Sequence, residues 1–160
     1  MLHFLLGDAT APTGEGRKII VHVCNDIGGW GKGFVGALSR RSRAPEMAYR
    51  KWFASGEGFA LGEVQFVPFA PEIEVANLVG QHDILRPENL HSLPPVRYEA
   101  IEKGLRTVAA RAQETDATVH MPRIGCGLAG GSWEQIEPII KRTLCDAGVA
   151  VFVYDLPAKS

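Results

Sequence analysis

Residues 18–33 read KIIVHVCNDIGGWGKG. The stretch opens with an almost continuous β-branched run, which is typical of a strand buried on both faces. A loop rich in glycine follows at 25–33, and an apolar segment begins directly after it at Phe34. This order predicts a strand, a glycine-rich loop and a helix, as in α/β proteins.

The same order returns near the C-terminus. Residues 117–121 predict a strand, 125–131 form a second glycine-rich loop, and a helix is expected from Ser132 to about Ala147. Gln135 lies three residues after Ser132, so we expect a capping box at the start of this helix. Gly148 is a suitable residue to end it.

The remaining apolar segments complete an α/β pattern. Period-two and β-branched runs predict further strands at 2–6, 63–69, 73–79 and 149–154, and three- to four-residue periodicity predicts helices at 34–43, 45–54 and about 96–114. Pro68 suggests that its strand lies at an edge or ends there. The order of elements predicts a mixed sheet sandwiched between helices.

Composition limits the classes of protein. The 160 residues are 46% hydrophobic and 22% charged, so we expect one globular domain over 1–160 rather than disorder. A formal net charge of −1 argues against holding nucleic acid by bulk charge. The apolar runs are too short for a membrane span, the first residues lack the features of a signal peptide, and the sparse cysteines favour a reducing, cytoplasmic compartment.

Four loops follow predicted strands, where ligands bind in such sheets: 7–10, 25–33, 80–83 and 125–131. A glycine-rich loop before a helix can present backbone N–H groups to an anion. For one such loop a simple tight turn would be the better explanation. Two in one small domain predict a diphosphate between them, although neither matches a Walker A or dinucleotide-binding motif.

Several of these motifs resemble the macro domain, a family of ADP-ribose-binding modules. The match includes Gly7-Asp8, Val23-Cys24-Asn25, Gly31-Lys32-Gly33, MPRIGCGL at 121–128 and VYDL at 153–156, and it covers essentially the whole chain. The resemblance implies a three-layer α/β/α fold with a mixed, roughly six-stranded sheet. The branch that looks most similar includes terminal ADP-ribose protein glycohydrolase and the yeast ADP-ribose 1″-phosphate phosphatase.

The resemblance also implies a set of ligand contacts. Asp8, with the Ala9 backbone beside it, would bind the adenine amino group, Tyr154 would pack on the adenine, and Asn25 would bind the distal ribose. Trp30, Gly31 and Gly33 would lie at that ribose and one phosphate. The other phosphate would be wrapped by the second loop, made of Gly125, Cys126, Gly127, Leu128, Ala129, Gly130 and Gly131.

Two departures from the family pattern affect the chemistry. Related glutamate-deacylating enzymes carry a lysine after the fourth strand and an aspartate after Gly-Cys-Gly-Leu, whereas this chain has Gly80-Gln81-His82 and Ala129 there. Lysine chemistry at that position is therefore excluded. His82 is the alternative, since histidine can deprotonate a water near neutral pH, with Asp83 beside it. That His82 only packs at the strand end stays an equal alternative.

Other candidates are weaker. Asn25, Asp26 and Gln81 could bear on the distal ribose or a water, although Asp26 also suits a turn. His22 lies inside a strand and is better explained as a satisfied core histidine, although the phosphatase resemblance implies a functional one there. Cys126 is interpreted as a small packing residue, and no residue spacing indicates a metal site or a cofactor.

These observations predict a hydrolase that removes mono-ADP-ribose from acidic side chains of modified proteins. An ADP-ribose 1″-phosphate phosphatase and a non-catalytic ADP-ribose reader stay as alternatives, and the missing lysine and aspartate add weight to the reader without placing it first. The expected partners are ADP-ribose and ADP-ribosylated proteins, with neither membrane nor nucleic acid indicated.

Overall fold

The computed structural model describes residues 1–89 and 93–157. Within them a six-stranded sheet has the order β1-β6-β5-β2-β4-β3. Its strands are β1 (Leu2–Leu6), β2 (Lys18–Asn25), β3 (Val64–Ala70), β4 (Ile73–Gln81), β5 (Thr118–Met121) and β6 (Val151–Asp155). All neighbouring pairs are parallel except β3 with β4, so the mixed sheet predicted from the sequence is confirmed.

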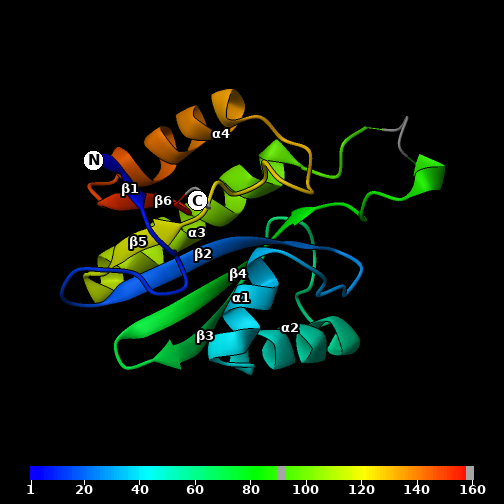
Figure 1. Cartoon of the computed structure of the whole chain (residues 1–160), viewed down its shortest axis with the longest axis horizontal. Helices are drawn as coiled ribbons and strands as arrows, with labels where there is room; N and C mark the ends of the chain where they lie inside the picture. Colours follow the sequence, from blue (N-terminus) through cyan, green and yellow to red (C-terminus); the bar gives the residue numbers. More distant parts are fainter. Residues whose placement is uncertain (90–92, 158–160) are drawn as a thin grey trace.

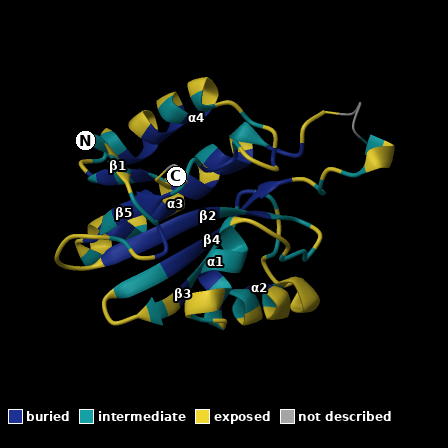
Figure 2. Ribbon diagram, in the orientation of Figure 1, coloured by how far each residue is buried: buried dark blue, intermediate teal, exposed yellow. Residues whose placement is uncertain are grey.

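Helices cover both faces of this sheet (Figure 1). They are α1 (Phe34–Arg41) and α2 (Ala44–Ser55) on one face, and α3 (Tyr98–Thr115) and α4 (Trp133–Ile140) on the other. Strand β2 contacts both layers because successive side chains point to opposite faces. Ile20 packs with Leu38 of α1, whereas Ile19 and Val21 belong to the larger core formed with α3 and α4. Buried residues accordingly concentrate in the central strands (Figure 2).

Two details differ from the sequence prediction. Ser132 is the N-cap of α4, but its side chain makes no capping hydrogen bond, and its backbone N–H donates to the hydroxyl of Tyr98 at 3.1 Å instead of to Gln135. The capping box is therefore not formed. The same helix widens into a π-helical turn, Lys141–Cys145, before Gly148 ends it with a φ of +81°. Pro68 does lie in the edge strand β3, beside a bulge.

The parallel strands bring the four candidate loops to one edge of the sheet. Strands β1, β2, β4, β5 and β6 all run the same way, so the loops after their carboxyl ends gather there, as expected for a ligand site of this sheet type. In the described part of the chain, no helix has the length and hydropathy that crossing a membrane requires.

Candidate functional site

A cleft of about 450 Å³ opens between these loops. Its walls come from the β2–α1 loop, the start of α1, the β4–α3 loop and the β5–α4 loop. The cleft is lined by many of the site residues predicted from the sequence, which are Asn25, Trp30, Gly31, Gly33, Gln81, Gly125, Gly127, Leu128 and Ala129. Residues from two glycine-rich loops far apart in the sequence therefore share one cavity.

Other predicted residues lie outside the cleft lining. They are Asp8, Ala9, Asp26, His82, Cys126, Gly130, Gly131 and Tyr154. Of these, Asp26 and His82 lie in loops whose neighbouring residues do line the cleft, and Cys126, Gly130 and Gly131 belong to the β5–α4 loop. Burial raises the pKa of the Cys126 thiol, which opposes a thiolate there.

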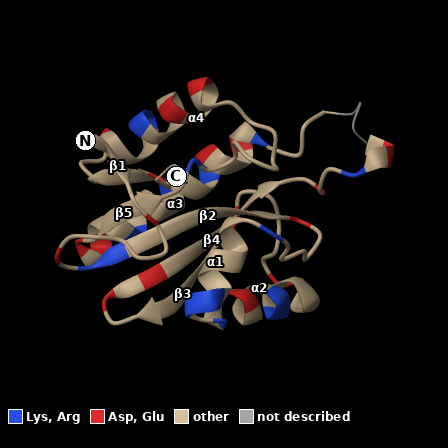
Figure 3. Cartoon of the chain, in the orientation of Figure 1, with Lys and Arg blue, Asp and Glu red and all other residues tan. Residues whose placement is uncertain are grey.

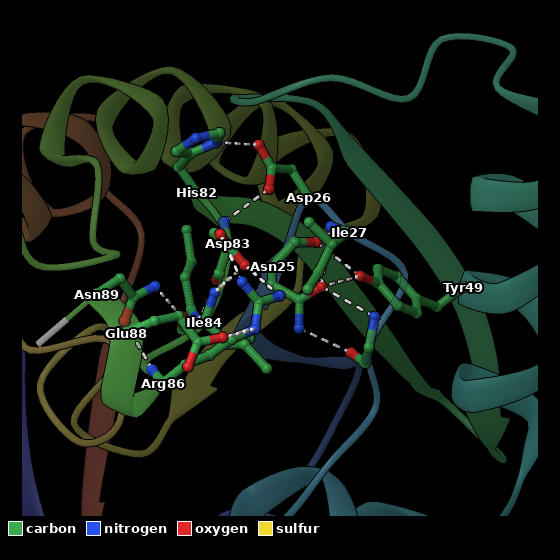
Figure 4. Close-up of polar contacts among 12 residues, drawn as sticks. Asn25, Asp26, Ile27, Tyr49, His82, Asp83, Ile84, Arg86, Glu88 and Asn89 are labelled. Atoms are coloured by element: carbon green, nitrogen blue, oxygen red, sulfur yellow. Dashed lines mark hydrogen bonds and ion pairs between the residues drawn. The ribbon is translucent and has the colours of Figure 1, made fainter.

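Asn25 organises the β2–α1 loop (Figure 4). Its Oδ1 accepts hydrogen bonds from the backbone N–H groups of Ile27 (3.1 Å) and Gly29 (2.9 Å), and its Nδ2 donates to the Gly29 carbonyl (2.9 Å). The hydroxyl of Tyr49, a buried residue of α2, lies 2.6 Å from the Asn25 carbonyl and 2.9 Å from Oδ1. One Nδ2 proton is left for a ligand, so Asn25 can act there only as a donor.

Both glycine-rich loops bring residues with unpaired backbone N–H groups to the wall of the cleft. Within the described residues, no acceptor pairs with the backbone N–H groups of Gly31 and Lys32 in one loop, or Gly127 and Leu128 in the other. Gly33, with a φ of +84°, is the N-cap of α1, so the positive end of that helix also faces the cleft. These donors form a site suited to an anion.

The charged side chains of the cleft add to this preference. Lys32 and Arg123 line it, and no Asp or Glu of the described residues does. Arg123 is held in place by Asp155, which accepts from its Nε at 2.9 Å and its Nη2 at 2.8 Å, and by the ring of Trp133 at 4.7 Å. Elsewhere, charges of both signs are mixed along the helices (Figure 3).

His22 lies in the floor of the cleft, buried to 2% exposure. Its Nε2 faces Oδ1 of Asn77, whose Nδ2 donates to Pro45 and Gln65. Because Asn77 uses its amide protons elsewhere, Nε2 must donate to Oδ1, which leaves Nδ1 unprotonated. Nδ1 has no partner among the described residues, so His22 is only half satisfied in the core.

The protonation state of His22 follows from its burial. Burial lowers the pKa of His22 to about 4, against a smaller opposing contribution from the hydrogen bond to Asn77. The imidazole is therefore neutral at physiological pH. Its Nδ1 is a neutral acceptor that is itself buried, beside the rings of Trp30 and Phe34.

His82 pairs with Asp26 across two loops (Figure 4). Its Nδ1 lies 2.7 Å from Oδ2 of Asp26, and Oδ1 of the same carboxylate accepts from the backbone N–H of Asp83 at 2.8 Å. The partner of His82 is thus Asp26, whereas the sequence suggested its neighbour Asp83. Asp26 also ties the β2–α1 loop to the β4–α3 loop, which carries the cleft residues Ile84 and Leu85.

Asp8 lies in the loop after β1. Its Oδ1 accepts from the backbone N–H (2.8 Å) and hydroxyl (2.7 Å) of Thr10, and Arg41 approaches Oδ2 at 3.5 Å. Partial burial raises the pKa of Asp8, but the Thr10 hydrogen bonds and the Arg41 charge outweigh it and lower the pKa below its ordinary value. Asp8 is therefore an ionised acceptor at neutral pH.

Some residues that line or support the cleft had no sequence signal. Tyr49 lies 24 positions from the asparagine it holds, and Ile84 and Leu85 follow a strand end without a motif. Arg123 stands inside MPRIGCGL, so the motif marked its loop but not its role. Among the described residues, no group of His, Cys, Asp and Glu side chains could hold a metal ion.

No protein-family model matches the sequence, but solved structures do. A protein of unknown function from Bacteroides thetaiotaomicron is 54% identical, with a TM-score of 0.93 over 98% of each chain. A macrodomain protein from Streptomyces coelicolor is 51% identical, with a TM-score of 0.84 over 97% of this chain and 99% of that one.

Curated relatives match this chain over part of their own length. A chromodomain-helicase-DNA-binding protein 1-like from Mus musculus is 30% identical over 98% of this chain, which spans only 18% of that protein. A DNA ADP-ribosyl glycohydrolase from Thermus aquaticus is 28% identical over 97% of this chain, which spans 41% of that protein. In both relatives, most of the protein lies outside the matched region.

Proposed function

Because the chain belongs to the macrodomain family, we propose that its cleft binds ADP-ribose and that the domain hydrolyses mono-ADP-ribosyl esters on acidic protein side chains. One observation carries the proposal: residues with unpaired backbone N–H groups, from both glycine-rich loops, line the cleft together with Lys32 and Arg123. These walls suit a diphosphate, and the remaining Nδ2 proton of Asn25 suits a ribose hydroxyl. ADP-ribose contains both groups.

The ligand contacts follow from these chemical preferences. The diphosphate lies between the two glycine-rich loops, near Lys32 and Arg123. The distal ribose lies beside Asn25, where a ribose hydroxyl accepts from Nδ2. The adenine lies toward the β1 loop, where its amino group donates to the ionised Asp8.

The proposed reaction is a displacement at C1″ of the distal ribose. A water oxygen attacks C1″ as the bond from C1″ to the ester oxygen breaks, and the water proton passes to Nε2 of His82. Asp26 accepts from Nδ1 and so leaves Nε2 as the basic nitrogen. The departing carboxylate needs no proton, which fits a cleft without a carboxylic acid among its described lining residues.

A hydrolysis assay tests the activity. A peptide mono-ADP-ribosylated on glutamate should release free ADP-ribose and unmodified glutamate, measured by mass spectrometry. Phosphate released from ADP-ribose 1″-phosphate, with the peptide left intact, would instead support the phosphatase alternative. Binding without turnover of either substrate would support a reader, which the absence of the family lysine and aspartate would then explain.

Substitution of His82 tests the proposed base. His82→Ala should lower turnover by about 10²–10⁴-fold, the usual contribution of a general base, with little change in ADP-ribose affinity. Arg86→Ala, in the same loop, is a matched control and should retain turnover. Unchanged turnover in His82→Ala would contradict the role, and an equal loss of turnover and affinity would mean that His82 binds rather than catalyses.

A further inference from the structure

The position of Tyr154 does not suit a ring that stacks on a nucleobase. It is 4% exposed and lies outside the cleft lining. Its ring lies under the start of the β1–β2 loop, where a Cβ on Gly7 would come within 3.4 Å of it. A side chain exposed to only 4% has little surface to offer a ligand.

The hydroxyl of Tyr154 contacts the β1–β2 loop, which carries Asp8. It accepts a hydrogen bond from the backbone N–H of Thr13 at 3.1 Å and lies 2.8 Å from Nδ1 of His120. His120 is 1% exposed, and its Nε2 lies 2.7 Å from the hydroxyl of Thr118. The hydroxyl therefore connects β5 and β6 to the loop that follows β1.

That loop has few other attachments to the sheet. The Gly7 N–H donates to the Asp155 carbonyl at 2.8 Å, and Nε of Arg41 donates to the Thr10 hydroxyl at 2.7 Å. Asp8 lies between the Gly7 and Thr13 attachments, and among the described residues its own carboxylate bonds only within the loop and to Arg41. Losing one attachment should let the carboxylate sample more orientations.

We propose that Tyr154 is a positioning residue that sets base selectivity through its hydroxyl, by tethering the loop that carries Asp8, and not by packing on the adenine. This inference rests on the proposed binding of ADP-ribose. Two consequences separate it from packing. Removing only the hydroxyl should matter, and the effect should disappear once Asp8 no longer contacts the base.

Calorimetric titration with ADP-ribose and GDP-ribose tests this. Tyr154→Phe keeps the ring and should weaken ADP-ribose binding by about five-fold, the value of one ordinary hydrogen bond. The preference for adenine over guanine should fall by a similar factor. Tyr154→Leu should give the same loss. Glu15→Gln, an exposed position in the same loop, is the control and should match the unmodified protein.

The double variant separates tethering from a general loss of stability. Asp8→Ala should itself lower affinity and base preference, and adding Tyr154→Phe to it should change neither further, because coupled residues are not additive. Full affinity and preference in Tyr154→Phe, or an undiminished loss in the Asp8→Ala background, would overturn the inference. No binding of ADP-ribose by the unmodified protein would instead overturn the proposed function.

Discussion

Gly33 and Gly127 line the same cleft but differ in backbone conformation. Gly33 has a φ of +84°, a value that residues other than glycine adopt at a cost of roughly 1–2 kcal/mol. Gly127 has an ordinary backbone conformation, and a Cβ there would meet nothing within 4 Å. A substitution at Gly33 therefore tests backbone strain and binding together. One at Gly127 tests binding alone.

Gly127→Glu should abolish ADP-ribose binding without unfolding the protein. The side chain would enter the cleft and place a negative charge where the diphosphate is proposed to lie, so we expect at least about a 100-fold rise in Kd. The thermal midpoint should stay close to that of the unmodified protein. Gly127→Ala adds only a methyl group and should bind far better. If Gly127→Glu bound ADP-ribose as tightly as the unmodified protein, the diphosphate could not lie at this loop.

At the scale of elements, the cleft depends on how α2 supports the β2–α1 loop. The loop is folded around Asn25, and Asn25 is in turn held by the hydroxyl of Tyr49. Tyr49 is fully buried, and burial raises the pKa of its hydroxyl, so it stays a neutral donor. The loop geometry is therefore set from outside the loop.

Tyr49→Phe should disturb this support. Removing the hydroxyl takes one donor from the Asn25 carbonyl and Oδ1, which should lower the free energy of unfolding by about 0.5–1.5 kcal/mol and weaken ADP-ribose binding. Urea denaturation and calorimetry measure the two effects. Trp52→Phe, on the same helix, loses a hydrogen bond to Glu57 away from the cleft and should leave affinity unchanged. If Tyr49→Phe and Trp52→Phe bound ADP-ribose equally well, the proposed support of the loop by Tyr49 would be contradicted.

The elements themselves follow closely from local sequence. The β-branched run at Lys18–Asn25 and the apolar stripe of α3 have strong periodic signals, and the glycine-rich loops marked the edge of the sheet where the cleft lies. Contacts between distant segments had no such signal. The pairing of Asp26 with His82 and the tether from Tyr154 to Thr13 depend on tertiary packing, which a single sequence does not display.

At the scale of the whole molecule, His22 and His120 lie nearly fully buried, one on each of two paired strands. Burial lowers the pKa of each to about 4, and the charge of Lys18 contributes at His120. In the unfolded chain both titrate near the ordinary value of 6.5. Between these values the unfolded state binds more protons than the folded state, so stability is lost as pH falls.

The free energy of unfolding should therefore decrease from about pH 6.5 toward pH 4. One histidine contributes at most about 1.4 kcal/mol per pH unit to the slope of the unfolding free energy. The slope for the pair therefore approaches about 2.7 kcal/mol per pH unit. Urea denaturation at several values between about pH 5 and pH 7 measures the slope before most carboxylates titrate. His120→Gln should remove about half of it. A stability independent of pH in this range would contradict neutral buried histidines.

The proposed function requires that the two glycine-rich loops together form an ADP-ribose site. Isothermal titration calorimetry of the folded protein with ADP-ribose tests it most directly, with circular dichroism to verify folding. We expect one site per chain with a Kd in the micromolar range, equivalent to about −8 kcal/mol. Absence of binding heat at several temperatures, on protein shown to be folded, would contradict it.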